Sequence, residues 1–266
     1  MKRPPEPPST VQDQPLAYED PEFLRSEEGR PVRILAEYLQ PLHAFRRHKV
    51  HDTIVFFGSA RLREDGPLAR FCREARELAR MVAEWSESIS SSGRRYLVTT
   101  GGGPGIMEAA NRGASDAGGR TIGLNIGLPH EQRPNPYISP GLSFQFHYFF
   151  MRKLWFAYLA RALVVFPGGF GTMDELFEIL TLSQTRKLDR KVPVLLYGPE
   201  YWNKLLNFEF LVESGTIDRA DLDLFSFVDS PQQGLERLQS LLGSEPRPET
   251  PSIAKSKTPY DMDARP

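Results

Sequence analysis

Short hydrophobic runs alternate with longer segments of helical spacing between about residue 50 and residue 242. Short apolar runs are typical of buried strands, and apolar residues three or four positions apart are typical of helices that cover them. The predicted strands are 53–58, 96–100, 121–126, 163–166, 192–197 and 225–228, and the predicted helices include 68–85, 201–212 and 231–242. An aromatic segment at 144–150 fits either a strand or a helix.

This alternation predicts βαβ units and therefore a doubly wound, mostly parallel α/β sheet of the Rossmann-like class. We expect a single such domain over residues 31–243, with an extra helix at about 33–46 that Pro41 kinks or breaks. The ends, 1–30 and 244–266, are rich in proline and charged residues, so we predict a disordered arm and a disordered tail.

Charge and composition narrow the function classes. The formal net charge is −1, so no overall basic field favours nucleic acid or an anionic membrane as a partner. The N-terminus lacks the apolar core of a signal peptide, and no apolar run approaches the length of a membrane span, which predicts a soluble cytoplasmic protein. Cys72 is the single cysteine, and only His43 and His48 approach ligand spacing, so we expect no metal and no cofactor.

A first glycine-rich segment, TTGGGPGIMEAA (99–110), follows a predicted strand and precedes a helix. Its glycines let the backbone approach a ligand closely, and a helix N-terminus favours an anion such as a phosphate. The segment fits neither the G-x-G-x-x-G dinucleotide fingerprint nor the P-loop, which needs Gly-Lys-Ser/Thr. Tight turns without a ligand remain the alternative.

A second segment, PGGFGTMDE (167–175), occupies the same place after the strand at 163–166. Thr172 and Glu175 have the spacing of a helix capping box, which alone would explain Glu175. A carboxylate in the first helical turn would also be held ionised by the dipole and face the ligand edge. Arg152 and Lys153 lie upstream in an aromatic-rich helix, where surface snorkelling is the alternative to a role in the site.

Together, TGGGPGIMEAANRGA (100–114), MRK (151–153) and PGGFGTMDE (167–175) resemble the "lonely guy" family of nucleoside 5′-monophosphate phosphoribohydrolases, often mislabelled lysine decarboxylases. The similarity covers roughly 50–242 and includes VFFGSAR (55–61). Short plant-like members commonly carry Met-His-x-Arg-Lys, whereas Phe149 stands at the earlier methionine position here. This departure and the extra N-terminal helix resemble the longer bacterial-type forms and leave the base preference open.

The resemblance implies that Arg152 and Glu175 are the catalytic pair and that both glycine segments bind the 5′-phosphate. It also implies a homodimer or larger homo-oligomer with active sites shared between subunits. The phosphate- or nucleotide-binding residues implied in this way are Ser59, Gly102, Gly103, Gly105, Lys153, Gly168, Gly169, Gly171 and Thr172.

The predicted activity is hydrolysis of the N-glycosidic bond of a purine nucleoside 5′-monophosphate, either AMP or a cytokinin riboside monophosphate, to free base and ribose 5-phosphate. The competing hypothesis is a nucleotide or phosphorylated-cofactor carrier without turnover, since similar architectures include a molybdenum-cofactor carrier. Nothing in the sequence marks a Schiff-base lysine with pyridoxal-phosphate surroundings, as a decarboxylase would require. The released base, the pathway, the oligomer size and the role of the tails stay open.

Overall fold

A computed structural model describes residues 15–89, 95–127, 133–188 and 190–243. The chain divides into two compact units, Met1–Pro41 and Leu42–Pro266. The predicted start of the α/β domain at residue 31 therefore falls inside the first unit. In the described part of the chain, no helix has the length and apolar character needed to cross a bilayer.

The first unit contains short helices where we predicted a disordered arm. A 3₁₀ helix, η2 (Ala17–Glu19), precedes α1 (Pro21–Arg25), and Asp20 caps α1 by accepting hydrogen bonds from the Glu22 and Phe23 amides at 2.9 and 3.2 Å. The prediction of disorder is thus wrong for these residues, because a capped turn forms locally. Residues 1–14 and the predicted tail 244–266 lie outside the described residues.

Helix α2 (Arg30–His48) begins in the first unit and continues through Pro41 into the second. Of the two expectations for Pro41, a kink or a break, the break is therefore wrong. A proline removes one backbone hydrogen bond but does not by itself end a helix whose apolar face is packed. Beyond Pro41, Phe45 packs edge-on against Phe144 and Trp155, at ring-centroid distances of 5.1 and 5.2 Å.

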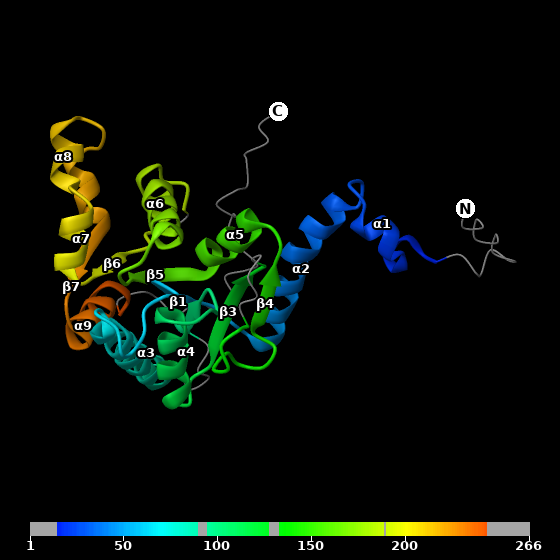
Figure 1. The fold of residues 1–266 in the computed structure, drawn as a ribbon, viewed down its shortest axis with the longest axis horizontal. Coiled ribbons are helices and arrows are strands. Elements are labelled where there is room, and N and C mark those ends of the chain that lie inside the picture. Colours follow the sequence, from blue (N-terminus) through cyan, green and yellow to red (C-terminus); the bar gives the residue numbers. More distant parts are fainter. Residues whose placement is uncertain (1–14, 90–94, 128–132, 189, 244–266) are drawn as a thin grey trace, which may run out of the picture. The chain divides into compact units, whose positions relative to one another are not determined.

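The second unit is built on one seven-stranded sheet, in the order β4-β3-β2-β1-β5-β6-β7, in which every pairing is parallel (Figure 1). The Rossmann-like α/β prediction is confirmed. The aromatic segment at 144–150 supplies both a strand and the start of a helix. The strands are β1 (Thr53–Phe57), β2 (Leu97–Thr100), β3 (Thr121–Ile126), β4 (Ser143–Phe146), β5 (Ala160–Val165), β6 (Val194–Tyr197) and β7 (Phe225–Val228).

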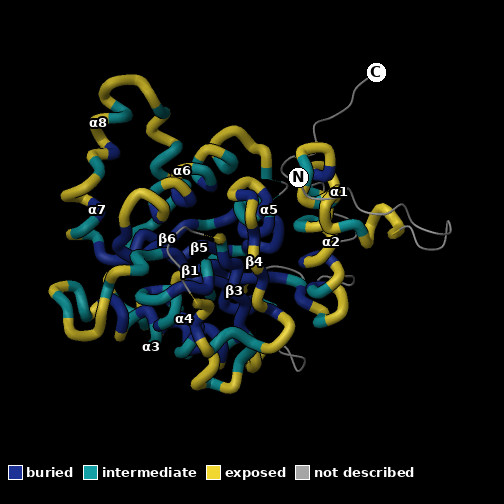
Figure 2. Tube along the Cα trace, turned by 45° about the vertical axis from the view of Figure 1, so that its right-hand side comes forward, coloured by how far each residue is buried: buried dark blue, intermediate teal, exposed yellow. Residues whose placement is uncertain are grey.

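Helices cover both faces of the sheet (Figure 1). α3 (Ala69–Ile89), α4 (Ile106–Asp116) and α9 (Pro231–Leu242) enclose one core with alternate strand residues such as Ile54, Phe56 and Val98. α5 (Phe149–Leu159) packs on the opposite face, where Phe156 meets Phe57 at 4.8 Å. The central strands β1, β2 and β6 are buried along their whole length, whereas the edge strands β4 and β7 are partly open to solvent and the outer helix surfaces are exposed (Figure 2). The remaining helices are α6 (Phe170–Gln184), α7 (Pro199–Leu205), α8 (Phe208–Glu213) and η3 (Arg219–Leu224).

The strand order places a topological switch between β1 and β5. The chain runs outward from β1 to β4 on one side and then returns to β5 on the other. Loops that leave the carboxyl ends of such neighbouring strands diverge and leave a crevice, which is where open α/β sheets bind ligands. The loops after β1, β2 and β5 contain Ser59 and both glycine-rich segments.

Candidate functional site at the sheet switch point

Ser59 joins the two glycine-rich loops. Its N–H donates to the carbonyl of Pro167 at 3.0 Å, and its carbonyl accepts the N–H of Ile106, the first residue of α4, at 3.1 Å. Gly105 has a φ of +69°, and a Cβ there would collide with the Ser59 carbonyl. Gly105 is also the N-cap of α4, which begins at Ile106. The backbone of Ser59 sets the spacing between the loops.

Hydrogen bonds with Thr100 and Asn135 hold the first loop. Gly102 has a φ of +74°, and a Cβ there would overlap the Asn125 side chain. Its N–H donates to Thr100 Oγ1 at 2.9 Å, while its carbonyl and that of Gly103 accept from Asn135 Nδ2 at 3.1 and 3.2 Å. These bonds hold the backbone of the loop in the conformation seen here.

The second loop leads into α6, whose N-cap is Gly169 without any side-chain cap. The capping-box interpretation of Thr172 and Glu175 is therefore wrong, because the helix begins three residues earlier than that pattern requires. A Cβ on Gly168 would strike the Thr172 hydroxyl, whereas a Cβ on Gly169 or Gly171 would meet nothing within 4 Å. These last two positions leave open space in front of the first turn of α6.

Arg152 lies between the first loop and α6. Its Nη2 donates to Glu175 Oε1 at 3.1 Å, and its Nη1 lies 3.8 Å from the position that a Cβ on Gly101 would occupy. The guanidinium also lies 5.5 Å from the ring centroids of Phe149 and Phe156. The structure thus brings the predicted pair together, beside the glycine loop.

Glu175 is 4% exposed, and this burial raises the pKa of its carboxyl group to about 7, against the opposing effect of the Arg152 and Lys153 cations. The expectation that the helix dipole holds Glu175 ionised is therefore wrong. Glu175 is the sixth residue of α6 and lies beyond the first turn, where the dipole acts most strongly. A buried carboxyl group with a pKa near neutrality suits proton transfer.

Lys153 is engaged by two carboxylates of α6. Its Nζ lies 2.8 Å from Asp174 Oδ2 and 3.1 Å from Glu178 Oε2, and its side chain is 17% exposed. These ion pairs tie α5 to α6 on either side of Glu175. In this arrangement the ammonium is directed at α6, so the predicted contact of Lys153 with phosphate has no geometric support.

Sequence reasoning missed the residues that hold the loops. Tyr201 of α7 donates its hydroxyl to the Gly168 carbonyl at 2.8 Å, and Asn135 follows β3 at a distance along the chain. Neither has a local signal, because their partners are backbone carbonyls that only the fold brings near. Within the described ranges, no cluster of three or more His, Cys, Asp or Glu residues is arranged to hold a metal.

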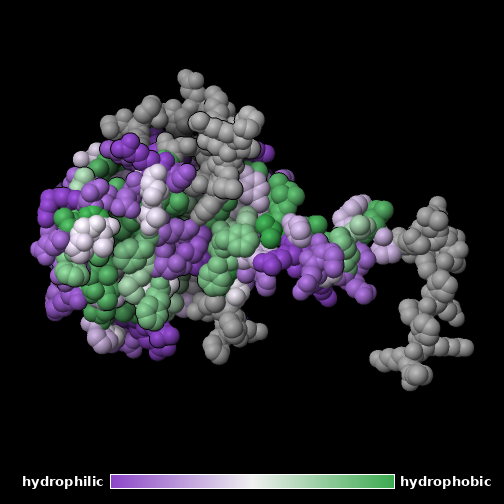
Figure 3. All heavy atoms as spheres, turned by 90° about the horizontal axis from the view of Figure 1, so that it is seen from above, coloured by the Kyte–Doolittle hydropathy of each residue, from purple (hydrophilic) through white to green (hydrophobic). Residues whose placement is uncertain are grey.

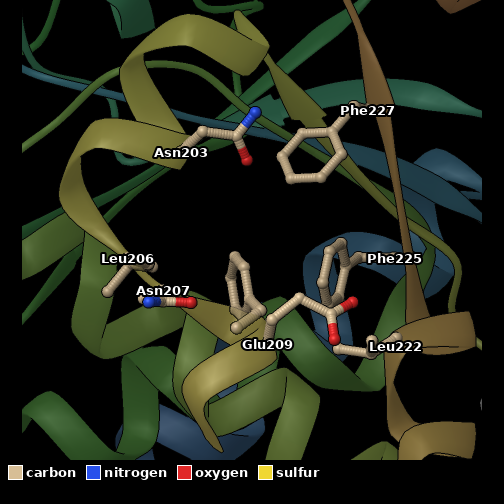
Figure 4. Close-up of a pocket in the computed structure, with 8 residues that line it drawn as sticks. Asn203, Leu206, Asn207, Glu209, Leu222, Phe225 and Phe227 are labelled. Carbon is tan, nitrogen blue, oxygen red and sulfur yellow. The ribbon is translucent and has the colours of Figure 1, made fainter. Parts of the chain in front are cut away.

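A separate cavity of about 520 Å³ opens beside β7, away from these loops (Figure 4). Its wall combines aromatic rings, including Phe225 and Phe227, with the Asn203 amide and the Glu209 carboxylate. Arg219 of η3 holds the Glu209 carboxylate in a two-bond pairing at 2.8 and 3.3 Å. The residues that line this cavity come from α7, α8, the turn between them, η3 and β7, and they include no residue of the candidate site.

Comparison with known proteins agrees with the motifs. Residues 107–238 match the family model described as "Possible lysine decarboxylase". A probable cytokinin riboside 5′-monophosphate phosphoribohydrolase of rice (Oryza sativa subsp. japonica) is 29% identical over 72% of this chain and 78% of its own. A cytokinin riboside 5′-monophosphate phosphoribohydrolase of Rhodococcoides fascians is 35% identical over 48% of this chain and 64% of its own.

Among solved structures, the molybdenum cofactor binding protein of Rippkaea orientalis matches with a TM-score of 0.50 and 19% identity, covering 72% of this chain and 98% of that one. At this identity the likeness supports the fold alone. The family model and the relatives in plants and a bacterium confirm the resemblance seen in the motifs. Through these matches the chain resembles the lonely guy family, and the family model that residues 107–238 match carries the description of a possible lysine decarboxylase.

Proposed function

We propose that the protein hydrolyses the N-glycosidic bond of a purine nucleoside 5′-monophosphate, such as AMP or a cytokinin riboside monophosphate, to the free base and ribose 5-phosphate. The observation that carries the proposal is the buried Glu175 carboxyl group, paired with Arg152 beside the first glycine loop. The activities printed for the rice and Rhodococcoides relatives support the same reaction class.

The glycine loops supply the binding part of this scheme. The open space at Gly169 and Gly171 lies at the N-terminus of α6, where unpaired backbone N–H groups and the positive dipole end favour an anion. The 5′-phosphate of the nucleotide is the anion proposed there. Tight binding of this remote group positions the ribose for reaction.

Glu175 supplies the chemistry. When the glycosidic bond breaks, its electron pair leaves with the base and positive charge develops on the ribose, which an ionised Glu175 stabilises. A water oxygen then forms the new bond to the anomeric carbon, and Glu175 accepts the proton that this water releases. The departing base takes up a proton from solvent. Arg152 holds the carboxylate in place through the 3.1 Å contact.

Purified wild-type protein and the Glu175→Gln variant, incubated with AMP, test the proposal when adenine release is followed by liquid chromatography. We expect adenine from the wild type and a loss of at least about 100-fold in kcat for Glu175→Gln, with AMP affinity retained. Glu200→Gln, which changes an exposed carboxylate of α7, is the matched control and should behave as wild type. AMP binding without turnover by the wild type, on AMP and on other nucleoside monophosphates, would instead establish a carrier.

A further inference from the structure

A buried polar cluster lies directly behind the first glycine loop and takes no part in the chemistry described above. It consists of Thr100, Asn111 and Asn135, whose exposures are 0, 0 and 7%. They come from β2, from α4 and from the segment after β3, so only the folded sheet brings them together. Burial of polar groups costs free energy unless they are hydrogen-bonded, and here each is bonded to another member or to the loop.

Asn135 makes the direct contacts to the loop. Its Nδ2 lies 3.1 Å from the Gly102 carbonyl, 3.2 Å from the Gly103 carbonyl and 2.9 Å from Asn111 Oδ1. Its backbone N–H also donates to the Gly102 carbonyl at 2.8 Å. The Tyr137 N–H donates to Asn135 Oδ1 at 3.2 Å, which fixes the amide with its nitrogen towards the loop.

Asn111 and Thr100 complete the cluster, and each donor in it faces an acceptor. Asn111 Oδ1 accepts from Thr100 Oγ1 at 2.6 Å, while Asn111 Nδ2 donates to the Thr121 hydroxyl. Because the Thr100 proton is used in this way, its oxygen is free to accept the Gly102 N–H. Both the N–H and the carbonyl of Gly102 are therefore hydrogen-bonded to the cluster.

The geometry of the peptide bond, together with these contacts, fixes the directions in which the N–H and carbonyl groups of the loop point. In a trans peptide the N–H points opposite to the carbonyl, and the described residues contain no cis peptide bond. Since Asn135 holds the Gly102 carbonyl, the Gly103 N–H points away from the cluster. Pro104, which follows the other bonded carbonyl, has no N–H. An anion approaching the loop on the side opposite Asn135 therefore meets a donor and no carbonyl oxygen of Gly102 or Gly103.

We infer that Asn135 is a positioning residue that gives the first glycine loop its affinity for a phosphate, by holding the Gly102 and Gly103 carbonyls on the side away from the ligand. The inference rests on the proposed function, in which the glycine loops bind the nucleotide, and it assigns the first loop a share in holding the phosphate beside the N-terminus of α6. Asn135 itself touches the loop and not the reacting atoms.

The test compares ligands with and without a phosphate. Asn135→Asp is nearly isosteric but directs an acceptor at three other acceptor oxygens, and Asn135→Ala removes the donor altogether. Leaving such buried groups unpaired costs free energy, which the altered loop avoids by turning its carbonyls towards the ligand side. We expect each variant to bind AMP and ribose 5-phosphate at least about tenfold more weakly in calorimetry. Adenosine affinity should stay within about twofold, and KM for AMP should rise more than kcat falls.

Asn203→Asp makes the same chemical change at an exposed asparagine of α7 and should leave all these values unchanged. Thermal unfolding checks that each variant is folded. If Asn135→Asp does not fold, the binding data for Asn135→Ala test the inference. Unchanged AMP binding, or an equal loss for AMP and adenosine, would overturn the inference. If the wild-type protein binds phosphates without releasing adenine, the proposed reaction is contradicted. The role of Asn135 is still tested in that case, because the binding titrations do not depend on turnover.

Discussion

At the scale of single residues, the buried Glu175 combines its proposed role in proton transfer with a cost in stability. Its carboxyl group has a pKa of about 7, whereas an unfolded chain would give an ordinary value near 4.5. A carboxyl group with a raised pKa in the folded state stabilises the fold when protonated, and this contribution is lost as the pH rises. The same burial that provides a proton acceptor near neutrality therefore destabilises the protein at neutral pH.

Glu175→Gln should remove this pH dependence, because the amide does not ionise. Between about pH 5 and pH 7, where the wild-type carboxyl group ionises only in the unfolded chain, the wild type should lose stability relative to the variant. The change should approach about 3 kcal/mol and level off above pH 7. Urea unfolding of both proteins at several pH values measures the difference, and a constant difference across this range would contradict the raised pKa.

At the scale of elements, the glycines of the two loops serve different purposes. Gly102 and Gly105 are required by the chain itself, since both have positive φ and both would place a Cβ inside a neighbouring residue. Gly171 lies in the first turn of α6 with space around it, and neither its conformation nor its packing requires glycine. Its absent side chain is explained by the approach of a ligand, or of another chain.

The pair Gly102→Ala and Gly171→Ala separates these purposes. Gly102→Ala should destabilise the protein by about 1–3 kcal/mol through strain and overlap with Asn125. Gly171→Ala should leave the melting temperature equal or slightly higher, because alanine favours a helix by up to about 1 kcal/mol over glycine. The second variant should nevertheless bind AMP more weakly. Scanning calorimetry and AMP titration measure the two effects, and full AMP affinity in Gly171→Ala would exclude a ligand at this position.

At the scale of the whole molecule, large hydrophobic side chains stay exposed on the helices that bear the site. Phe170 is 90% exposed, Phe149 51% and Phe150 48%. Figure 3, which views the protein from above, shows hydrophobic residues open to solvent among hydrophilic ones. Exposed apolar groups of this size are typical of an interface, and they flank Arg152 and the N-terminus of α6.

We therefore expect a homodimer or larger homo-oligomer whose subunits meet near the site. Phe170→Ser should shift the full-length protein towards the monomer in light scattering and lower its turnover of AMP, because the partner would no longer help to enclose the site. Phe210→Ser, at a similarly hydrophobic exposed position on α8, serves as the control. A wild-type monomer with full turnover would contradict a shared site.

Much of the fold was predictable because the local periodicity of apolar residues distinguishes strands from helices. The strands around Ile54, Val98 and Leu195 stand out as short apolar runs, and all are buried. The first unit was less predictable, because the Asp20 cap of α1 depends on a few hydrogen bonds rather than on a repeating pattern. The aromatic segment around Phe144 was ambiguous for a related reason, since its Phe residues suit either element.

The sequence by itself determined the fold class, since periodicity is a local property, and its motifs named Arg152 and Glu175 as candidates through their resemblance to a known family. Only the tertiary structure decided how these residues are used. Burial by residues distant along the chain raised the pKa of Glu175, which its place near a helix start had suggested would stay ionised. The ion pairs of Lys153 and the hold of Asn135 on the first loop likewise depend on partners in other elements. Electrostatics and loop conformation are set by what packs around a group, and that is fixed only when the sheet and its helices are assembled.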